Sequence, residues 1–149
     1  MWAGAGWYTI RRVESNGTAD ELREALAPLW RGGEFRLVVL FGSVAAGRNS
    51  RESDLDLALM PVGEIDEVAV TAEVIRLTHR NDVDVVNLAH ADPMVLMEVA
   101  RGGVVLFASD PSQFTEFRSL AFRRYADTEK LRRAQRRALD LFQRRHEPR

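Results

Sequence analysis

Two aspartates placed two positions apart are the residues of this chain best suited to chemistry. Asp54 and Asp56 lie in the stretch FGSVAAGRNSRESDLDLALM, residues 41–60, where they alternate with leucines. Because side chains of a strand alternate between its two faces, both carboxylates project to one side and the leucines to the core side. Carboxylates this close repel one another unless a cation lies between them. Mg²⁺ is typically held by one or two carboxylates together with substrate phosphates, so the pair predicts a magnesium site.

A glycine and a serine precede this pair and suit the phosphates that such a metal would accompany. Gly42 and Ser43 directly follow the stretch FRLVVLF, residues 35–41, which is typical of a buried strand. Glycine lets backbone N–H groups approach a phosphate, and the serine hydroxyl donates to another phosphate oxygen. The alternative for Ser43 is that it only caps a helical turn. We interpret the segment as a phosphate site followed by a metal site.

The elements that must position these residues alternate between strands and helices. Helical spacing predicts helices over residues 18–30, 65–80 and 92–103 and a single turn over 43–47. Apolar and β-branched runs predict strands over residues 35–41, 54–60, 82–88 and 104–107. From residue 111 onward the pattern is helical. This order predicts one α/β (α+β) domain over residues 1–110, with residues 111–149 as its C-terminal helical extension.

Composition excludes several classes of protein. The chain has 149 residues, a formal net charge of −1 and no cysteine, so it forms no disulfide framework and no thiolate metal site. No signal peptide and no apolar run long enough to span a membrane is evident, and we expect a cytoplasmic protein without membrane contact.

The C-terminal segment differs in charge from the rest of the chain. Residues 113–149 contain ten Arg and one Lys against five acids, a balance of +6 that leaves −7 elsewhere. An apolar stripe from Phe114 to Phe142 runs through the same segment. The first interpretation is a docked helix with a solvated arginine face, and the alternatives are contact with a partner protein or with nucleic acid. Of these two partners we expect a protein, because the negative remainder opposes a polyanion.

These motifs together resemble a known family. Gly42-Ser43, ten residues and then Asp54-x-Asp56 is similar to the signature of the polymerase-beta-like nucleotidyltransferases. Two short segments are most similar to the minimal nucleotidyltransferases, the antitoxin halves of HEPN/MNT toxin–antitoxin pairs. They are SDLDL from Ser53 and VDVVNL at residues 83–88. The resemblance extends over residues 22–107. It implies a mixed central sheet of about four strands flanked by helices.

The resemblance also implies roles for individual residues. Asp84 matches the family's third carboxylate, with Asp82 at the strand entrance as the second choice. Three aspartates are implied both as catalytic residues and as ligands of two Mg²⁺ ions: Asp54, Asp56 and Asp84. Four residues are implied in nucleotide binding: Gly42, Ser43, Arg48 and Ser53. This chain has Ala46 where the family often has arginine, so phosphate contacts are expected from Arg48 or Arg51 instead.

The implied activity is transfer of AMP from ATP to a tyrosine hydroxyl of a HEPN ribonuclease toxin, which silences that toxin within a hetero-oligomer. Two alternatives use the same motif or the same partner. One is a small-molecule adenylyltransferase of the antibiotic-modifying kind, and the other is an antitoxin that acts by binding alone. The few residues beyond 111 favour an acceptor held on another protein over a small acceptor held by an added domain. An intact set of carboxylates argues against pure binding, because such a cluster is costly without a metal.

Overall fold

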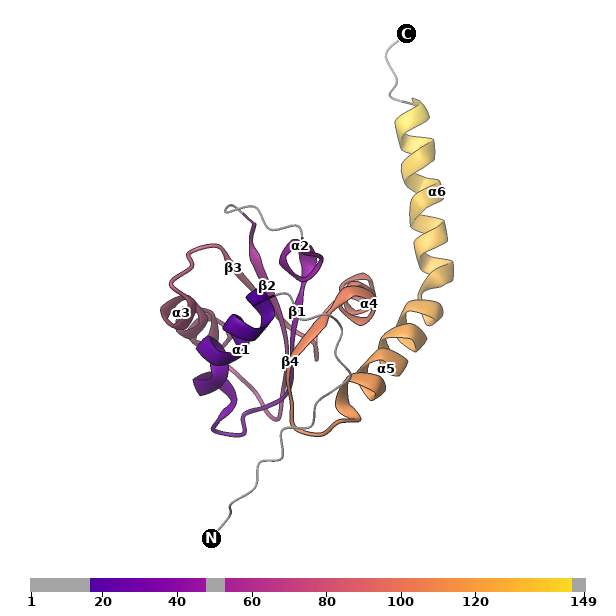
Figure 1. Ribbon diagram of the computed structural model, residues 1–149. Coiled ribbons are helices and arrows are strands. Elements are labelled where there is room, and N and C mark those ends of the chain that lie inside the picture. Colours follow the sequence, from indigo (N-terminus) through magenta and orange to yellow (C-terminus); the bar gives the residue numbers. More distant parts are fainter. Residues whose placement is uncertain (1–16, 48–52, 146–149) are drawn as a thin grey trace.

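The computed structural model describes residues 17–47 and 53–145, which form four strands and six helices (Figure 1). The strands are β1 (Phe35–Phe41), β2 (Leu55–Pro61), β3 (Val83–Asn87) and β4 (Val104–Ala108). The helices are α1 (Gly17–Trp30), α2 (Gly42–Ala45), α3 (Glu67–Thr78), α4 (Pro93–Gly102), α5 (Gln113–Asp127) and α6 (Glu129–Arg145). Each strand and helix expected within these ranges is present, with ends shifted by a few residues.

The four strands form one mixed sheet in the order β3-β2-β1-β4. β1 runs antiparallel to both β2 and β4, whereas β2 and β3 are parallel. A parallel pair needs a crossover connection, and α3 supplies it between β2 and β3. The mixed sheet of about four strands expected from the family resemblance is confirmed.

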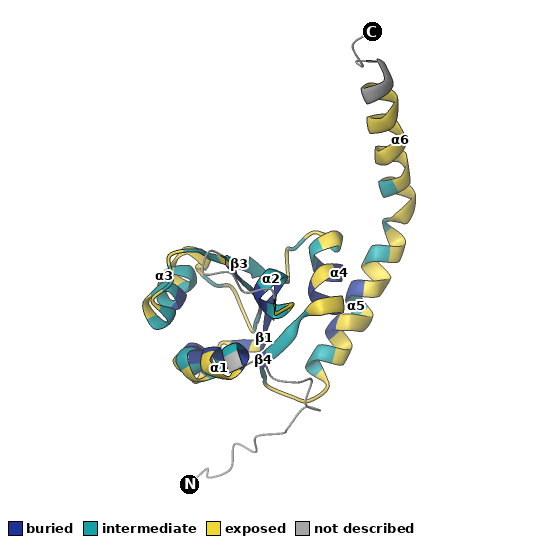
Figure 2. Cartoon of the chain, turned by 45° about the horizontal axis from the view of Figure 1, so that its top comes forward, coloured by how far each residue is buried: buried dark blue, intermediate teal, exposed yellow. Residues whose placement is uncertain are grey.

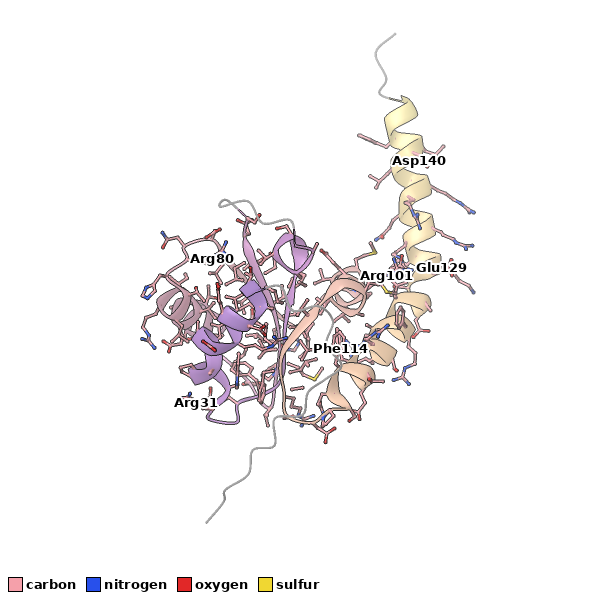
Figure 3. The ribbon with its side chains drawn as sticks, in the orientation of Figure 1. Arg31, Arg80, Arg101, Phe114, Glu129 and Asp140 are labelled. Atoms are coloured by element: carbon pink, nitrogen blue, oxygen red, sulfur yellow. The ribbon has the colours of Figure 1, made fainter. Side chains whose placement is uncertain are left out.

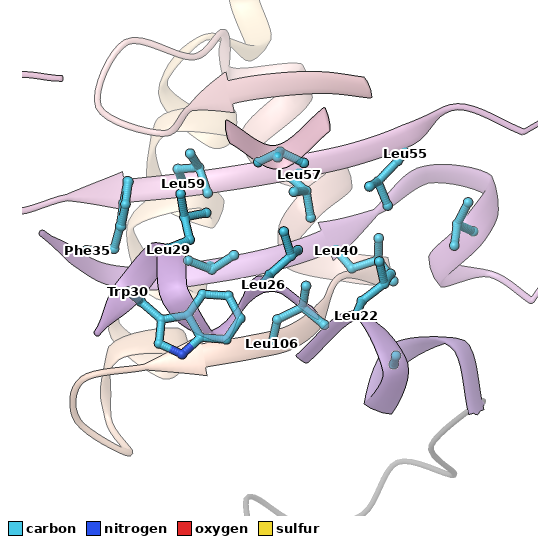
Figure 4. Close-up of a cluster of buried hydrophobic side chains, with 14 residues drawn as sticks. Leu22, Leu26, Leu29, Trp30, Phe35, Leu40, Leu55, Leu57, Leu59 and Leu106 are labelled. Carbon is cyan, nitrogen blue, oxygen red and sulfur yellow. The ribbon is translucent and has the colours of Figure 1, made fainter. Parts of the chain in front are cut away.

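Helices cover both faces of the sheet, and each face has its own apolar core. α1 and α3 cover one face, where the leucines of β2 are fully buried against Leu26 and Val74 (Figure 4). α4 and α5 cover the other face, where Leu96 and Phe117 pack on residues of β1. The alternation of β2 therefore sends its leucines to the α1/α3 side and leaves its other side chains for the α4/α5 side.

Local signals in the sequence fix both ends of α4, which forms a wall of the site described below. The Asp92 carboxylate accepts a hydrogen bond from the Met94 N–H at 2.8 Å, and Pro93 occupies the first turn, where its missing N–H costs nothing. At the other end, a Cβ built on Gly103 would lie 2.5 Å from Cγ1 of Val39. α4 is thereby held close against β1.

The C-terminal helical region divides at Thr128 into two helices with different surroundings. α5 buries Phe117 and Ala121 and packs mainly against α4. α6 extends beyond the sheet, and its described side chains are exposed apart from the half-buried Arg132 (Figure 2). The docked helix expected from the apolar stripe is therefore seen in α5 and not in α6. The division into a domain over residues 1–110 and an extension over 111–149 stays a prediction.

No helix in residues 17–47 and 53–145 is both long and apolar enough to cross a membrane.

Candidate active site

The turn after β1 brings the glycine of the predicted phosphate site against one of the predicted metal ligands. Gly42 has a φ of +70°, and a Cβ at this position would lie 2.1 Å from Oδ2 of Asp56. β1 and β2 place Phe41 opposite Asp56, so the chain leaves β1 directly beside that carboxylate. Only glycine satisfies both the backbone conformation and the close approach.

Ser43 is the second residue of α2 and does not cap it. The N-cap position is Phe41, and no side chain makes a capping hydrogen bond there. The interpretation of Ser43 as merely a cap therefore finds no support in the geometry.

The three predicted aspartates gather at one end of the sheet. The parallel register of β2 and β3 pairs Asp56 with Asp84, so both project from the same face. Asp54 lies just before β2, two residues from Asp56, and its charge acts on that carboxylate. Burial raises the pKa of Asp56 above its ordinary value of 3.8, and the negative charges of Asp84, Asp54 and Glu98 raise it further. The arrangement thus concentrates negative charge that a cation would offset.

Asp82, the second choice for the third carboxylate, makes a different set of contacts. Arg80 forms an ion pair with it at 3.2 Å and also donates a hydrogen bond to the carbonyl of Ser53. Its own backbone N–H and then Arg80 lower the pKa of Asp82, and its carbonyl accepts from the Leu55 N–H at 2.8 Å. Asp82 therefore ties β3 to the start of β2, and Figure 3 shows Arg80 at that edge of the molecule.

A cavity of about 540 Å³ adjoins the Gly-Ser turn. It lies between α2, α4 and the end of α5, and its lining includes Gly42, Ser43, Met94, Glu98, Arg101 and Tyr125. This volume lies within the usual range for small-molecule sites. Glu98 belongs both to the cavity lining and to the charges that act on Asp56, so the cavity and the carboxylates form one region.

No sequence motif marks Glu98, Arg101 or Tyr125 as residues of this site. A signal existed on α4, where Met94, Glu98 and Arg101 recur at helical spacing on a side distinct from buried Leu96 and Val99. Polar residues along one side of a helix are usually solvated surface, however, and only the packing of α4 against α2 turns this side toward a cavity.

The two other predicted nucleotide-binding residues are Ser53 and Arg48. Ser53 is half-buried, and its carbonyl is held by Arg80 beside the start of β2. Arg48, like Arg51, lies outside the described residues.

In the described ranges, no three His, Cys, Asp or Glu side chains lie close enough together to hold a metal ion by themselves.

Comparison with known proteins agrees with this geometry. Residues 29–112 match the family model described as polymerase beta, nucleotidyltransferase. The chain is 30% identical over 102 residues to the protein adenylyltransferase MntA of Shewanella oneidensis, covering 67% of this chain and 69% of that protein. It is 28% identical over 114 residues to the MntA of Aphanizomenon flos-aquae, covering 67% and 75%.

Solved structures share the fold. A chain from a toxin–antitoxin crystal structure with AMP-PNP superposes with a TM-score of 0.69 at 21% identity, covering 81% of this chain and 97% of that one. A chain from the complex of tri-AMPylated Shewanella oneidensis HEPN toxin with MNT antitoxin gives a TM-score of 0.67 at 20% identity, covering 81% and 98%. With the family model spanning more than half of its length, the chain belongs to the polymerase-beta nucleotidyltransferases, as a minimal nucleotidyltransferase similar to the MntA protein adenylyltransferases.

Proposed function

We propose that this protein transfers AMP from ATP to a hydroxyl group of a HEPN-type toxin and so neutralises it. The observation that carries the proposal is the pairing of Asp56 with Asp84 beside the Gly42 turn, at the edge of a cavity of nucleotide size. The names of the MntA relatives supply the reaction class, and the solved complexes with a HEPN toxin supply the class of partner. The proposed reaction takes place in the cytoplasm, in a hetero-oligomer with the toxin.

The cavity offers distinct surroundings for the two halves of ATP. Backbone N–H groups at Gly42 and the hydroxyl of Ser43 suit the phosphates, and the guanidinium of Arg101 brings a positive charge to the same cavity. Met94 and Tyr125 supply apolar surface for the nucleoside. Figure 3 shows Arg101 on α4 near the junction of α5 and α6.

The carboxylates fit a magnesium site that the nucleotide completes. Burial and the neighbouring negative charges raise the pKa of Asp56, and a cation bound beside it would favour the ionised carboxylate. Mg²⁺ is usually held by one or two protein carboxylates plus substrate phosphates, so a preformed set of three ligands is not required. Asp54, Asp56 and Asp84 would hold it, and its chemistry there is to offset the negative charge of the leaving pyrophosphate.

The transfer step forms one bond to phosphorus, breaks another and needs a group that accepts a proton. The acceptor hydroxyl oxygen forms a bond to the α-phosphorus of ATP, and the bond from that phosphorus to the bridging oxygen of the β-phosphate breaks. Pyrophosphate leaves with that electron pair. Asp84 is exposed at the edge strand β3, where an incoming hydroxyl can reach it, and it accepts the proton. Ser43 and Gly42 keep the phosphates in line for the attack.

The decisive experiment follows labelled AMP from ATP, with Mg²⁺, onto a purified HEPN-type toxin. Asp84→Asn should abolish transfer while the protein still binds its partner, because an amide of the same shape cannot accept the proton. Asp82→Asn is the matched control on the same strand, and it should retain transfer, since its partner is Arg80.

Two results would contradict the proposal, and a third would show that the variants do not report on catalysis. Full neutralisation of the toxin by Asp84→Asn would establish inhibition by binding alone. Label on an aminoglycoside-like small molecule and none on the protein would establish the antibiotic-modifying alternative. Equal loss in the Asp82→Asn control would show that the substitutions act through the fold.

A further inference from the structure

Helix α6 has two chemically different sides, and both are exposed. Its apolar positions recur at helical spacing, as expected for one continuous stripe. The stripe consists of Leu131, Ala134, Ala138, Leu141 and Phe142. Leu131 and Leu141 each expose 59% of their surface, although leucine side chains of this domain are otherwise mostly buried. A leucine stripe this exposed is typical of a surface that a partner covers.

The charge of α6 narrows the class of partner. Its seventeen residues include seven Lys or Arg and two acids, a net charge of +5, which leaves −6 for the rest of the chain. Pairing two copies of α6 stripe to stripe would bring their basic flanks together, and like charges across an interface are destabilising. An acidic surface is the complementary one.

The first turn of α6 is anchored at the cavity of the active site. The guanidinium carbon of Arg132 lies 3.6 Å from the centre of the Tyr125 ring, and Tyr125 lines that cavity. Arg132 also donates a hydrogen bond to the Thr128 hydroxyl at the junction of α5 and α6. From this junction α6 extends past the end of the sheet at which α2 lies (Figure 1). A partner that covers the first turn of α6 would therefore lie beside the cavity that Gly42 lines.

We propose that α6 is a docking arm for the acceptor protein, which would receive its leucine stripe in an apolar groove edged by acidic residues. This inference rests on the proposed transfer to a protein. An amphipathic helix laid in an apolar groove is a common mode of protein recognition. The negative charge of the rest of the chain disfavours an anionic lipid surface or a nucleic acid, because either would approach the acidic cluster of Asp54, Asp56, Asp84 and Glu98.

The test uses the full chain, with a purified HEPN-type toxin as the probe. The double variant Leu131→Gln/Leu141→Gln removes both leucines of the stripe but leaves the charge and helix propensity of α6 nearly unchanged. Its matched control is Val62→Gln/Val68→Gln, which replaces two other exposed apolar residues, 54% and 79% exposed, away from α6. Binding affinity, KM for the acceptor, kcat and the rise in melting temperature with Mg²⁺ and ATP are measured on each.

The stripe variant should bind the probe at least about tenfold more weakly and raise KM for the acceptor to a similar extent, because both leucines would bury apolar surface in the groove. Its kcat and its response to Mg²⁺ and ATP should match those of the control. A separate pair, Arg136→Gln/Arg137→Gln, should weaken binding more at low salt than at high salt.

Two outcomes overturn the docking arm while the proposed function stands: unchanged affinity and KM in the stripe variant, or equal losses in the variant and the control. Loss of binding to phosphatidylserine vesicles or to RNA in the stripe variant, with binding to the probe intact, would overturn it in favour of a lipid or nucleic-acid surface. If the unmodified protein neither binds nor labels the probe, both the proposed function and the docking arm are wrong.

Discussion

Strand β2 contributes to both faces of the sheet, and the two faces differ in how far they are buried. On the α1/α3 face, Leu55, Leu57 and Leu59 of β2 are fully buried in a core that residues of α1 and α3 share. On the α4/α5 face, Ala58 is buried, but Asp56 at the same end as the Gly42 turn is only partly covered. A domain can therefore keep an unfavourable cluster of carboxylates at one end of a face because the opposite face supplies uninterrupted apolar burial.

The largest effect should come from Asp56→Asn, which acts on the open face. Transfer of AMP should fall by about 1,000-fold or more, since a metal ligand and the charge it balances contribute several kcal/mol to the transition state. The melting temperature should not fall, because the ionised Asp56 is disfavoured in the folded protein by burial and by its acidic neighbours. Parallel assays of transfer and of thermal unfolding check both halves, and retained transfer would remove Asp56 from the site.

Leu57→Ala should give the opposite pattern one residue away. Leu57 is completely buried, so its truncation should cost about 2–5 kcal/mol of unfolding free energy through lost burial and an unfilled cavity. The gain in unfolding free energy on adding Mg²⁺ and ATP should persist, because the Leu57 side chain faces away from Asp56. Urea denaturation with and without the ligands measures both the loss and the gain. If Leu57→Ala abolished the ligand response, the two faces would not be separable.

Local signals were sufficient for the elements that carry the site. The alternation of aspartate and leucine predicted which side chains of β2 share a face, and the apolar run over residues 35–41 coincides with β1. The caps Asp66 and Asp92 determine where α3 and α4 begin. The mixed order of the sheet came from the family resemblance, since periodicity does not reveal which strands pair.

What the sequence left out depends on contacts between distant segments. The sequence predicts Gly42 as a residue that lets the backbone approach a phosphate. Its close approach to Asp56 arises only when β1 and β2 pair. Glu98 and Tyr125 belong to the site because α4 and α5 pack on the face of the sheet from which Asp56 projects. No local pattern in the sequence specifies this packing. The separation of α5 from α6 at Thr128 was missed for a similar reason. The apolar stripe continues through both helices, and only packing shows that one part is docked while the other is exposed.

A smaller effect is expected at Ser43, on the phosphate side of the open face. Ser43→Ala should weaken ATP binding by about 1–3 kcal/mol, the range for a hydrogen bond to a charged group. Stability should change little, because Ser43 makes no capping hydrogen bond to α2. Calorimetric ATP affinity and melting temperature on the same variant decide the matter. Unchanged affinity would leave phosphate binding to the backbone around Gly42.

The smallest effects should appear in the pH dependence of stability, where Asp56 and Asp82 are predicted to differ in sign. The pKa of Asp56 is raised in the folded protein, so its ionised form destabilises the fold at neutral pH, and this cost disappears as the pH falls through the raised pKa and below 3.8. Asp56→Asn should thus melt at a higher temperature than the parent near pH 7, with the difference shrinking toward low pH.

The pKa of Asp82 is lowered by hydrogen bonds from its own backbone N–H and from Arg80, so the ionised carboxylate stabilises the fold. That contribution is present above 3.8 and is lost as the pH falls through the lowered pKa. Asp82→Asn should therefore melt at a lower temperature than the parent near pH 7, and the two should converge in acid. Thermal melts of the parent and both variants, taken between about pH 7 and pH 3 without Mg²⁺, provide the comparison. If both variants shifted in the same direction, the contrast between an open carboxylate cluster around Asp56 and an ion-paired Asp82 would be wrong.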